Sequence, residues 1–219
     1  LNGVCISSTA MIDSTNGKVF FSLPQVPNYT GFEVKKYLET ECNLVTEVEN
    51  DVNCVALAES ISGSGKGYSS VLCLAIGTGI GGGFTENGHL LRGATFSACE
   101  VGYITVGDSD LEHLGSWDGL RVFNEARKGD KDCIKAIDVM AFSIAQGLAS
   151  LSYILNPAAI VLGGGIMNEK ELLEKIKAYF GTLINPLIAK NTAILAATYK
   201  NDAGLVGAYY HFKEKHPDL

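Results

Sequence analysis

The sequence has few of the features that mark membrane-bound, exported or nucleic-acid-binding proteins. Its 219 residues include 17 Lys and Arg against 24 Asp and Glu, a net charge of −7, and the positive side chains form no dense block. Nucleic acids and anionic membrane surfaces are therefore poor candidates for partners. The chain also lacks an 18-residue apolar stretch and a basic segment followed by an apolar one. It is expected to be soluble, with no visible export signal.

Paired cysteines are lacking as well. The six cysteines, at positions 5, 42, 54, 73, 99 and 133, are scattered and form no Cys-x-x-Cys pair. Most of them lie in apolar segments, so they are expected to be reduced core residues of a cytoplasmic protein. With 47% hydrophobic and 19% charged residues, the chain can bury a substantial core. Its length fits one large domain or two small ones.

The hydrophobic pattern predicts strands that alternate with helices, which is typical of an α/β fold. Strands are expected at residues 3–8, 18–21, 44–48, 71–74, 84–85, 159–162 and 193–197, and helices at 33–41, 52–60, 118–127, 131–155, 169–180 and 202–213, the last capped by Asp202. The Gly- and Ser-rich residues 62–67 form the most linker-like stretch, and we place a domain boundary there.

The start of the chain is unusual. Residues 3–8 have the composition of a buried strand, but nothing precedes them to pair with. An edge strand of this kind would expose unpaired backbone groups. This favours the hypothesis that the sequence is part of a longer chain, which a native start codon immediately before Leu1 would contradict.

The most distinctive segment is residues 77–83, which contain five glycines and follow an apolar run. Such a backbone can approach a ligand closely, and its exposed N–H groups can bind an anion such as phosphate. Thr78 adds a hydroxyl donor. Residues 84–85 continue as strand and residues 86–88 suit a hairpin turn, so this is not the helix-opening dinucleotide motif. A tight hairpin without a ligand is the alternative interpretation.

Asn50 and Asp51 lie where a strand ends and a helix begins, the position at which open α/β sheets bind ligands. Asp51 could accept a substrate proton while Asn50 binds neighbouring hydroxyl groups. Helix capping explains the same residue types equally simply. Gly163, Gly164 and Gly165 also follow a strand and precede a helix. They could admit a flat adenine ring or form only a tight turn.

Other polar residues have weaker signals. Glu100, in a small and apolar loop, is either a surface residue or an acceptor for sugar hydroxyl groups. Glu112 and His113 lie in a polar loop and are expected to be exposed, as is His89 beside the hairpin turn. Lys66 lacks the spacing and the strand–helix context of a phosphate-binding loop.

These motifs together resemble the ROK family of sugar kinases and sugar-responsive repressors across essentially the whole chain. The motifs occur in family order at residues 49–54, 77–83, 91–94, 100–102 and 160–165. The resemblance implies an actin-like ATPase (ribonuclease H-like) fold with two domains and a cleft between them. It implies that Asp51 is the catalytic base, and that Asn50 and Glu100 bind the sugar. It further implies ATP phosphate binding by Gly77, Thr78, Gly79 and Gly81, and adenosine binding by Gly163, Gly164 and Gly165.

The departures from the family pattern are informative. Tyr103 stands where the family commonly has His, and no cysteine occurs between Cys99 and Cys133, so the usual zinc knot is missing. A structural zinc needs about four N or S ligands, and none is expected here. Glu112 aligns with the sugar-binding Glu that follows the knot. Tyr103 and residues 201–209 are similar to the zinc-free β-glucoside kinase branch.

Residues 8–11 replace the usual Pro-Gly turn near the sugar, and the family's N-terminal Asp-Ile-Gly-Gly-Thr hairpin is missing. The missing hairpin again favours a longer chain. We expect one domain of residues 1–68 plus 201–219, completed by roughly 60–80 absent residues, and a second of residues 69–200.

The resemblance predicts a cytoplasmic, homodimeric kinase that uses ATP and Mg²⁺ to phosphorylate a sugar primary (6-) hydroxyl. The sequence does not choose the sugar, although loss of the knot and its His favours a roomier pocket and a β-glucoside. A sugar-sensing repressor and a non-catalytic sugar-binding module are the alternatives.

Overall fold

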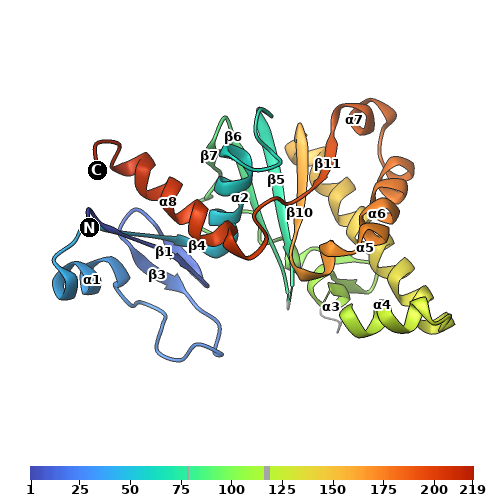
Figure 1. Cartoon of the computed structure of the whole chain (residues 1–219), viewed down its shortest axis with the longest axis horizontal. Coiled ribbons are helices and arrows are strands. Elements are labelled where there is room, and N and C mark those ends of the chain that lie inside the picture. The colour runs from blue at the N-terminus through green and yellow to red at the C-terminus, as the bar shows by residue number, and fades with distance from the viewer. Residues whose placement is uncertain (78, 116–118) are drawn as a thin grey trace.

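The computed structural model describes residues 1–77, 79–115 and 119–219. The largest sheet among these residues has five strands in the order β11-β10-β5-β6-β7. Its strands are β5 (Ser70–Ile76), β6 (Ile80–Glu86), β7 (His89–Leu90), β10 (Ala159–Gly163) and β11 (Ala193–Ala196). The pairs β5–β6 and β6–β7 are antiparallel, and β10 runs parallel to both β5 and β11. In Figure 1 the strands of this sheet stand nearly upright at the centre of the molecule.

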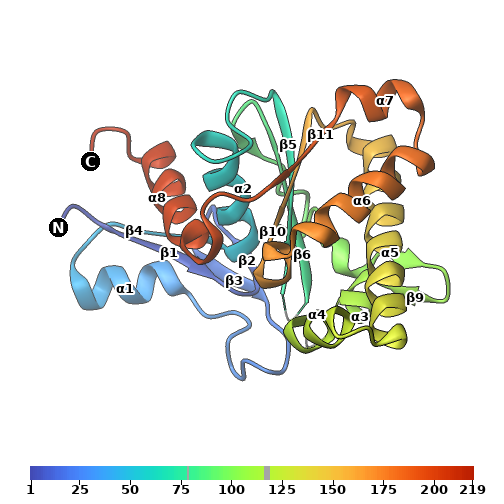
Figure 2. The ribbon, with the colours of Figure 1, turned by 45° about the vertical axis from the view of Figure 1, so that its right-hand side comes forward.

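Helices cover both faces of this sheet, as the alternation of side chains along β5 requires. Leu72 and Leu74 belong to a core cluster with helices α5 (Lys131–Leu155) and α6 (Lys170–Leu183). Val71 and Cys73 point to the other face, toward α2 (Asp51–Ile61). The helix α8 (Ala203–Lys215) packs on α2 beyond that face (Figure 2).

The helix α5 has the limits that the sequence predicts. The Asp130 side chain accepts hydrogen bonds from the first-turn N–H groups of Asp132 and Cys133, and Asn156 ends the helix in a left-handed conformation before Pro157. By length and composition α5 could cross a membrane, with a mean hydropathy of 1.4 over 18 residues. However, 56% of that window is buried within the protein, as expected of a core helix.

The N-terminal residues build a smaller layer. Strands β1 (Val4–Ser8) and β4 (Thr46–Asn50) pair in parallel, and β2 (Met11–Asp13) and β3 (Lys18–Phe21) form a hairpin beside them. With α1 (Val34–Cys42) they enclose a core of Ile12, Val19, Val34 and Val48. The helix α8 returns to this layer and contacts both β1 and β4.

Most predicted elements are confirmed, and the differences are local. The strand predicted at 44–48 extends to Asn50 as β4. Asp202 lies at the N-cap of α8, but its side chain makes no capping hydrogen bond with the residues described. The sequence analysis missed short elements, namely β2, β7, β8 (Thr105–Val106), β9 (Ser109–Asp110), α3 (Leu111–Gly115), α7 (Pro186–Asn191) and three 3-10 turns. The helix predicted at 118–127 is α4 (Gly119–Arg127); residue 118 lies outside the described residues.

Candidate functional site

Asn50 joins the end of β4 to the start of α2. Its Oδ1 accepts hydrogen bonds from the backbone N–H groups of Val52 (2.9 Å) and Asn53 (3.0 Å), which confirms the capping interpretation. Its Nδ2 donates to the backbone oxygen of Ala10 and to Oδ1 of Asp51, both at 3.0 Å. Capping therefore fixes Asn50 without removing it from the site, because its amide also orients the Asp51 carboxylate.

Ala10 has a backbone conformation that is unfavourable for a residue with a side chain. Its φ is +96°, outside the regions that L-residues usually occupy. The Asn50 amide holds this strained turn through the Ala10 carbonyl. The turn replaces the Pro-Gly turn of the family pattern, and its neighbours Thr9 and Met11 line the cavity described next.

A cavity of about 250 Å³ brings together five of the site residues that the sequence predicts, namely Asn50, Asp51, Gly81, Glu100 and Tyr103. Asn50, Asp51, Glu100 and Tyr103 supply polar groups to its wall. Gly81 and Gly82 of β6 also line it, and their small size leaves room beside Asp51. The remaining wall is mixed: Met11, Phe21, Leu23 and Val26 supply large apolar side chains, and Thr9, Ser22 and Gln25 supply polar ones.

The sequence analysis missed this apolar wall because residues 24–28 indicated only a loop. Phe21, Leu23 and Val26 are partly exposed, at 46%, 46% and 39%. The large apolar side chains in and beside a proline-containing loop could have indicated a binding surface, because exposed apolar groups often mark one. They give the wall formed by residues 21–26 apolar surface beside the polar Ser22 and Gln25.

The carboxylates of the cavity have altered acidity. Burial raises the pKa of Asp51, and the hydrogen bonds from the Val52 N–H and the Asn50 amide oppose this only in part. Burial also raises the pKa of Glu100, and the negative charges of Asp51 and Glu112 add to it. A buried carboxylate with a raised pKa is a better proton acceptor than one in water.

The glycine-rich turn follows β5, and the N–H of Gly77 donates to the oxygen of Gly79 at 2.9 Å. Thr78 lies outside the described residues. Glu112, in α3, lies beside this turn: a Cβ on Gly79 would be 3.0–3.1 Å from its carboxylate atoms, and one on Gly102 would be 2.6 Å from Oε2. Glu112 thus lies beside the turn, and it is near enough to Glu100 for its negative charge to raise the pKa of Glu100.

The two glycine motifs lie next to each other at the carboxyl ends of two neighbouring strands of the sheet. Because β5 and β10 are parallel, Gly163 is paired with Ala75 at the carboxyl ends of both strands. Gly164 has a φ of +102°, and a Cβ there would lie 1.9 Å from the carbonyl oxygen of Ile76. No described atom lies within 4 Å of a Cβ built on Gly165, so its backbone has open space. This is an edge that a flat group and a phosphate chain could approach.

Comparisons with known proteins show the family and the fold. The sequence profile of the ROK family matches residues 1–118 and 111–215. The chain is 39% identical over 233 residues to the uncharacterised protein CPE0188 of Clostridium perfringens, covering 98% of this chain and 79% of that protein. It is 31% identical over 244 residues to a β-glucoside kinase of Listeria innocua, covering 98% and 80%.

A solved structure of similar shape is a ROK family glucokinase from Streptomyces griseus in complex with glucose and AMPPNP. It superposes with a TM-score of 0.81 at 26% identity, over 95% of this chain and 80% of that one. The fold is therefore that of the actin-like ATPases, as the sequence predicts. The chain belongs to the ROK family.

Proposed function

We propose that this protein is an ATP-dependent sugar kinase that transfers the γ-phosphoryl group to a sugar primary (6-) hydroxyl. The observation that carries the proposal is the placement of Asp51, which shares one cavity with Asn50, Glu100 and Tyr103. Such a group of hydroxyl-binding side chains around one half-buried carboxylate suits a sugar. Similarity to a β-glucoside kinase and a glucokinase supports the same activity.

In this proposal Asp51 is the general base. It removes the proton of the sugar hydroxyl as the hydroxyl oxygen attacks the γ-phosphorus, and ADP leaves in line. The Asn50 amide holds one carboxylate oxygen of Asp51, which leaves the other free to face the hydroxyl. Glu100 and Tyr103 bind the remaining hydroxyl groups from the cavity wall. Glu112, which lies beside Gly79 and does not line the cavity, is proposed to bind the sugar as well.

The two glycine motifs are proposed to bind the nucleotide. Gly77, Thr78, Gly79 and Gly81 would bind the phosphates, and residues 163–165 would bind the adenosine. Within residues 1–77, 79–115 and 119–219 no group of three His, Cys, Asp or Glu is placed to hold a metal ion. Mg²⁺ is proposed to enter with ATP, with phosphate oxygens and water as most of its ligands. The ion would neutralise charge that develops on the phosphates. The absence of a structural zinc stays a prediction.

Two domains, residues 1–68 with 201–219 and residues 69–200, are proposed to close on the two substrates. Closure would exclude water and so limit hydrolysis of ATP. The apolar wall of Phe21, Leu23 and Val26 favours a substrate whose second ring or aglycone extends from the glucose unit, as in a β-glucoside. The protein is expected to be cytoplasmic and homodimeric. Light scattering of the purified protein would check the homodimer.

The test is ADP release by the full-length protein with Mg-ATP and a panel of glucose, mannose, N-acetylmannosamine and cellobiose. Sugar-dependent ADP production with at least one sugar is expected. Sugar binding by calorimetry without ADP production would overturn the kinase and indicate a sugar-binding module. Sugar-responsive binding of DNA by the same protein would identify a repressor, which would need a basic helix-turn-helix outside these residues.

A further inference from the structure

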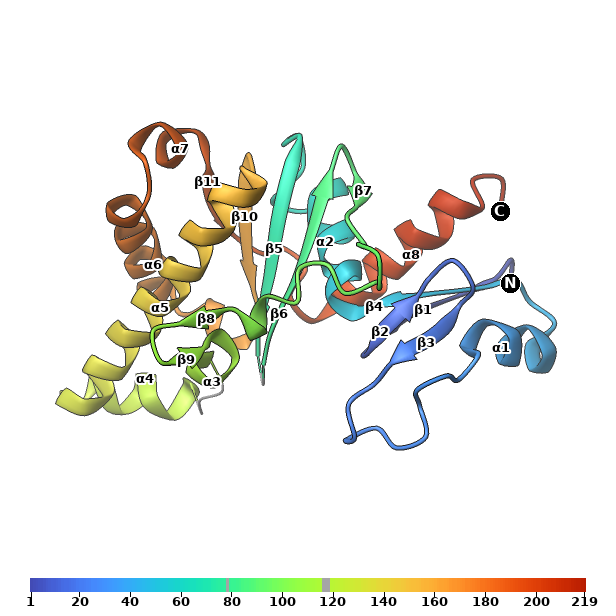
Figure 3. The same ribbon diagram turned by 180° about the vertical axis from the view of Figure 1, so that it is seen from behind.

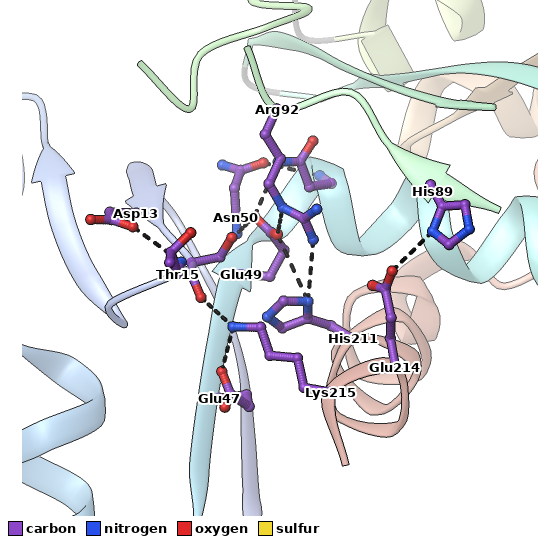
Figure 4. Close-up of polar contacts among 12 residues, drawn as sticks. Asp13, Thr15, Glu47, Glu49, Asn50, His89, Arg92, His211, Glu214 and Lys215 are labelled. Carbon is purple, nitrogen blue, oxygen red and sulfur yellow. Dashed lines mark hydrogen bonds and ion pairs between the residues drawn. The ribbon is translucent and has the colours of Figure 1, made fainter. Parts of the chain in front are cut away.

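Glu49 is fully buried, at 0% exposure, and lies next to the residues of the cavity without lining it. Its Oε1 accepts hydrogen bonds from the backbone N–H of Asn50 (2.8 Å) and from Nδ2 of Asn53 (3.1 Å). Its Oε2 accepts from Nε of Arg92 at 2.8 Å. Figure 4 shows Glu49 between Arg92 and the end of β4. A buried carboxylate needs such donors, because without them the cost of burial is uncompensated.

Arg92 lies on the segment that follows β7 and leads to Glu100. This segment runs from beside β4 back across β6 to β8 (Figure 3). The backbone oxygen of Arg92 accepts from the N–H of Ala98 at 3.2 Å. A Cβ on Gly82 would lie 2.6 Å from the oxygen of Cys99, so the far end of the segment rests on β6. Arg92 thus fixes one end of a short loop whose other end carries Glu100.

His211 of α8 lies against the same pair. Its Nδ1 is 3.9 Å from Oε2 of Glu49 and 3.4 Å from an Nη of Arg92. Burial, together with the positive charges of Lys215 and Arg92, lowers the pKa of His211 to about 4. The negative charge of Glu49 acts in the opposite direction. The imidazole is therefore neutral at pH 7, and Arg92 is the cation that balances Glu49.

We infer that Glu49 and Arg92 form a positioning clasp that sets the place of Asn50 and Asp51 relative to Glu100. Glu49 holds the backbone of Asn50 and the first turn of α2, while Arg92 holds the loop that ends at Glu100. The clasp therefore joins the base to the opposite sugar-binding carboxylate through a single ion pair. The inference rests on the proposed function for its kinetic consequence, though its geometry does not.

The kinetic test uses Glu49→Gln and Arg92→Gln in the full-length protein, well below their melting temperatures. Misplacement of the base should lower kcat/KM for the sugar about 10–100-fold, while KM for ATP changes by less than about threefold. Arg92→Lys should give an intermediate loss, since it keeps the charge but not the guanidinium geometry.

Glu47→Gln is the matched control. Glu47 is also buried on β4 and pairs with Lys35 and Lys215, but those contacts lie away from the cavity. This variant should lose stability and keep kcat/KM. Wild-type kcat/KM in both clasp variants, or an equal loss in Glu47→Gln, would overturn the inference.

A second measurement does not depend on catalysis. Amide hydrogen exchange of the ligand-free Arg92→Gln protein should be faster than in the wild type at residues 50–53 and 92–100. If the wild-type protein releases no ADP with any sugar, the proposed function fails and this measurement alone decides the clasp. Faster exchange confined to those two segments would support it, and unchanged exchange there would overturn it.

Discussion

Asp51 combines burial with hydrogen bonds that favour its charged form, and burial dominates. A carboxylate whose pKa is raised in the folded state costs folding free energy at pH 7, because the unfolded chain ionises it more easily. Such a cost is common at functional residues, where activity and stability compete.

Asp51→Asn should therefore separate activity from stability. We expect kcat to fall by about 10²–10⁴-fold, the usual contribution of a general base. The melting temperature at pH 7 should stay the same or rise, since the amide avoids the cost of a buried charge. ADP release and thermal unfolding of the two proteins check this. Full activity in the variant would refute the role of Asp51.

Ala10 offers a second prediction at the scale of one residue. Its φ of +96° is unfavourable for alanine and free of strain for glycine. Ala10→Gly should raise the free energy of unfolding by about 1 kcal/mol, the relief of strain exceeding the extra entropy of the unfolded chain. Ala10→Val should lower it. Urea unfolding of both variants decides, and a less stable glycine variant would contradict the strain argument.

At the scale of elements, the contact of α2 with α8 depends on one missing side chain. A Cβ on Gly207 would lie 1.7 Å from the carbonyl oxygen of Cys54, far inside van der Waals contact. The helices can approach this closely only because that position is glycine. This contact also carries His211 toward the clasp, so helix packing and site geometry are linked.

Gly207→Ala should force the two helices apart and lower the free energy of unfolding by about 1–3 kcal/mol, as overpacking does. Gly181→Ala in α6 is the control, because no described atom lies within 4 Å of its Cβ. That change should stabilise the protein by about 0.5–1 kcal/mol through helix propensity. Equal effects of the two changes in chemical denaturation would contradict the packing argument.

Elements with strong local signals could be predicted from the sequence. The helix α5 follows from its apolar period, the Asp130 cap and Pro157, and these act within a few residues of one another. The strands β8 and β9 have two residues each, and α3 has five. Elements this short form where the rest of the chain holds them, so no local pattern announces them.

The candidate site was predicted where it depends on strand ends and glycine turns. Asn50 and the two glycine motifs follow from those rules, and the parallel pairing of β5 and β10 brings the motifs together. The pairing of Glu49 with Arg92 joins residues 43 positions apart, and only tertiary structure can show it. The roles of these residues in binding and catalysis stay predictions.

For the whole molecule, buried ionisable groups determine the response to acid. Burial of Glu47 alone would raise its pKa, but hydrogen bonds from Lys215, Lys35 and His216 outweigh it and lower the pKa to about 2. The pKa of His211 is lowered to about 4, mainly by burial and also by the positive charges of Lys215 and Arg92. The negative charges of Glu49 and Glu47 oppose this shift. In both cases the unfolded state binds more protons, so these two groups lower stability as the pH falls, whereas Asp51 and Glu100, whose pKa values are raised, act in the opposite direction.

His211 and Glu47 should therefore lower the free energy of unfolding in two stages. The first lies between about pH 6.5 and 4 and reflects His211, with up to about 3 kcal/mol at stake. The second begins near pH 4.5 and continues toward pH 2 as Glu47 becomes protonated. Urea unfolding from pH 7 to 3 measures the profile. His211→Asn should flatten the first stage only, and an unchanged slope there would exclude His211 as its cause.

The contact of Gly164 with Ile76 has a mechanical consequence. Because the backbones of Gly164 and Ile76 touch, the carboxyl ends of β5 and β10 are held at one separation. In the proposed closure of the two domains, these two strand ends would move together. A ligand that spans both turns would meet a preformed surface and would spend little of its binding energy on ordering the protein. A methyl group at position 164 would collide with the carbonyl oxygen of Ile76 and force the two strand ends apart.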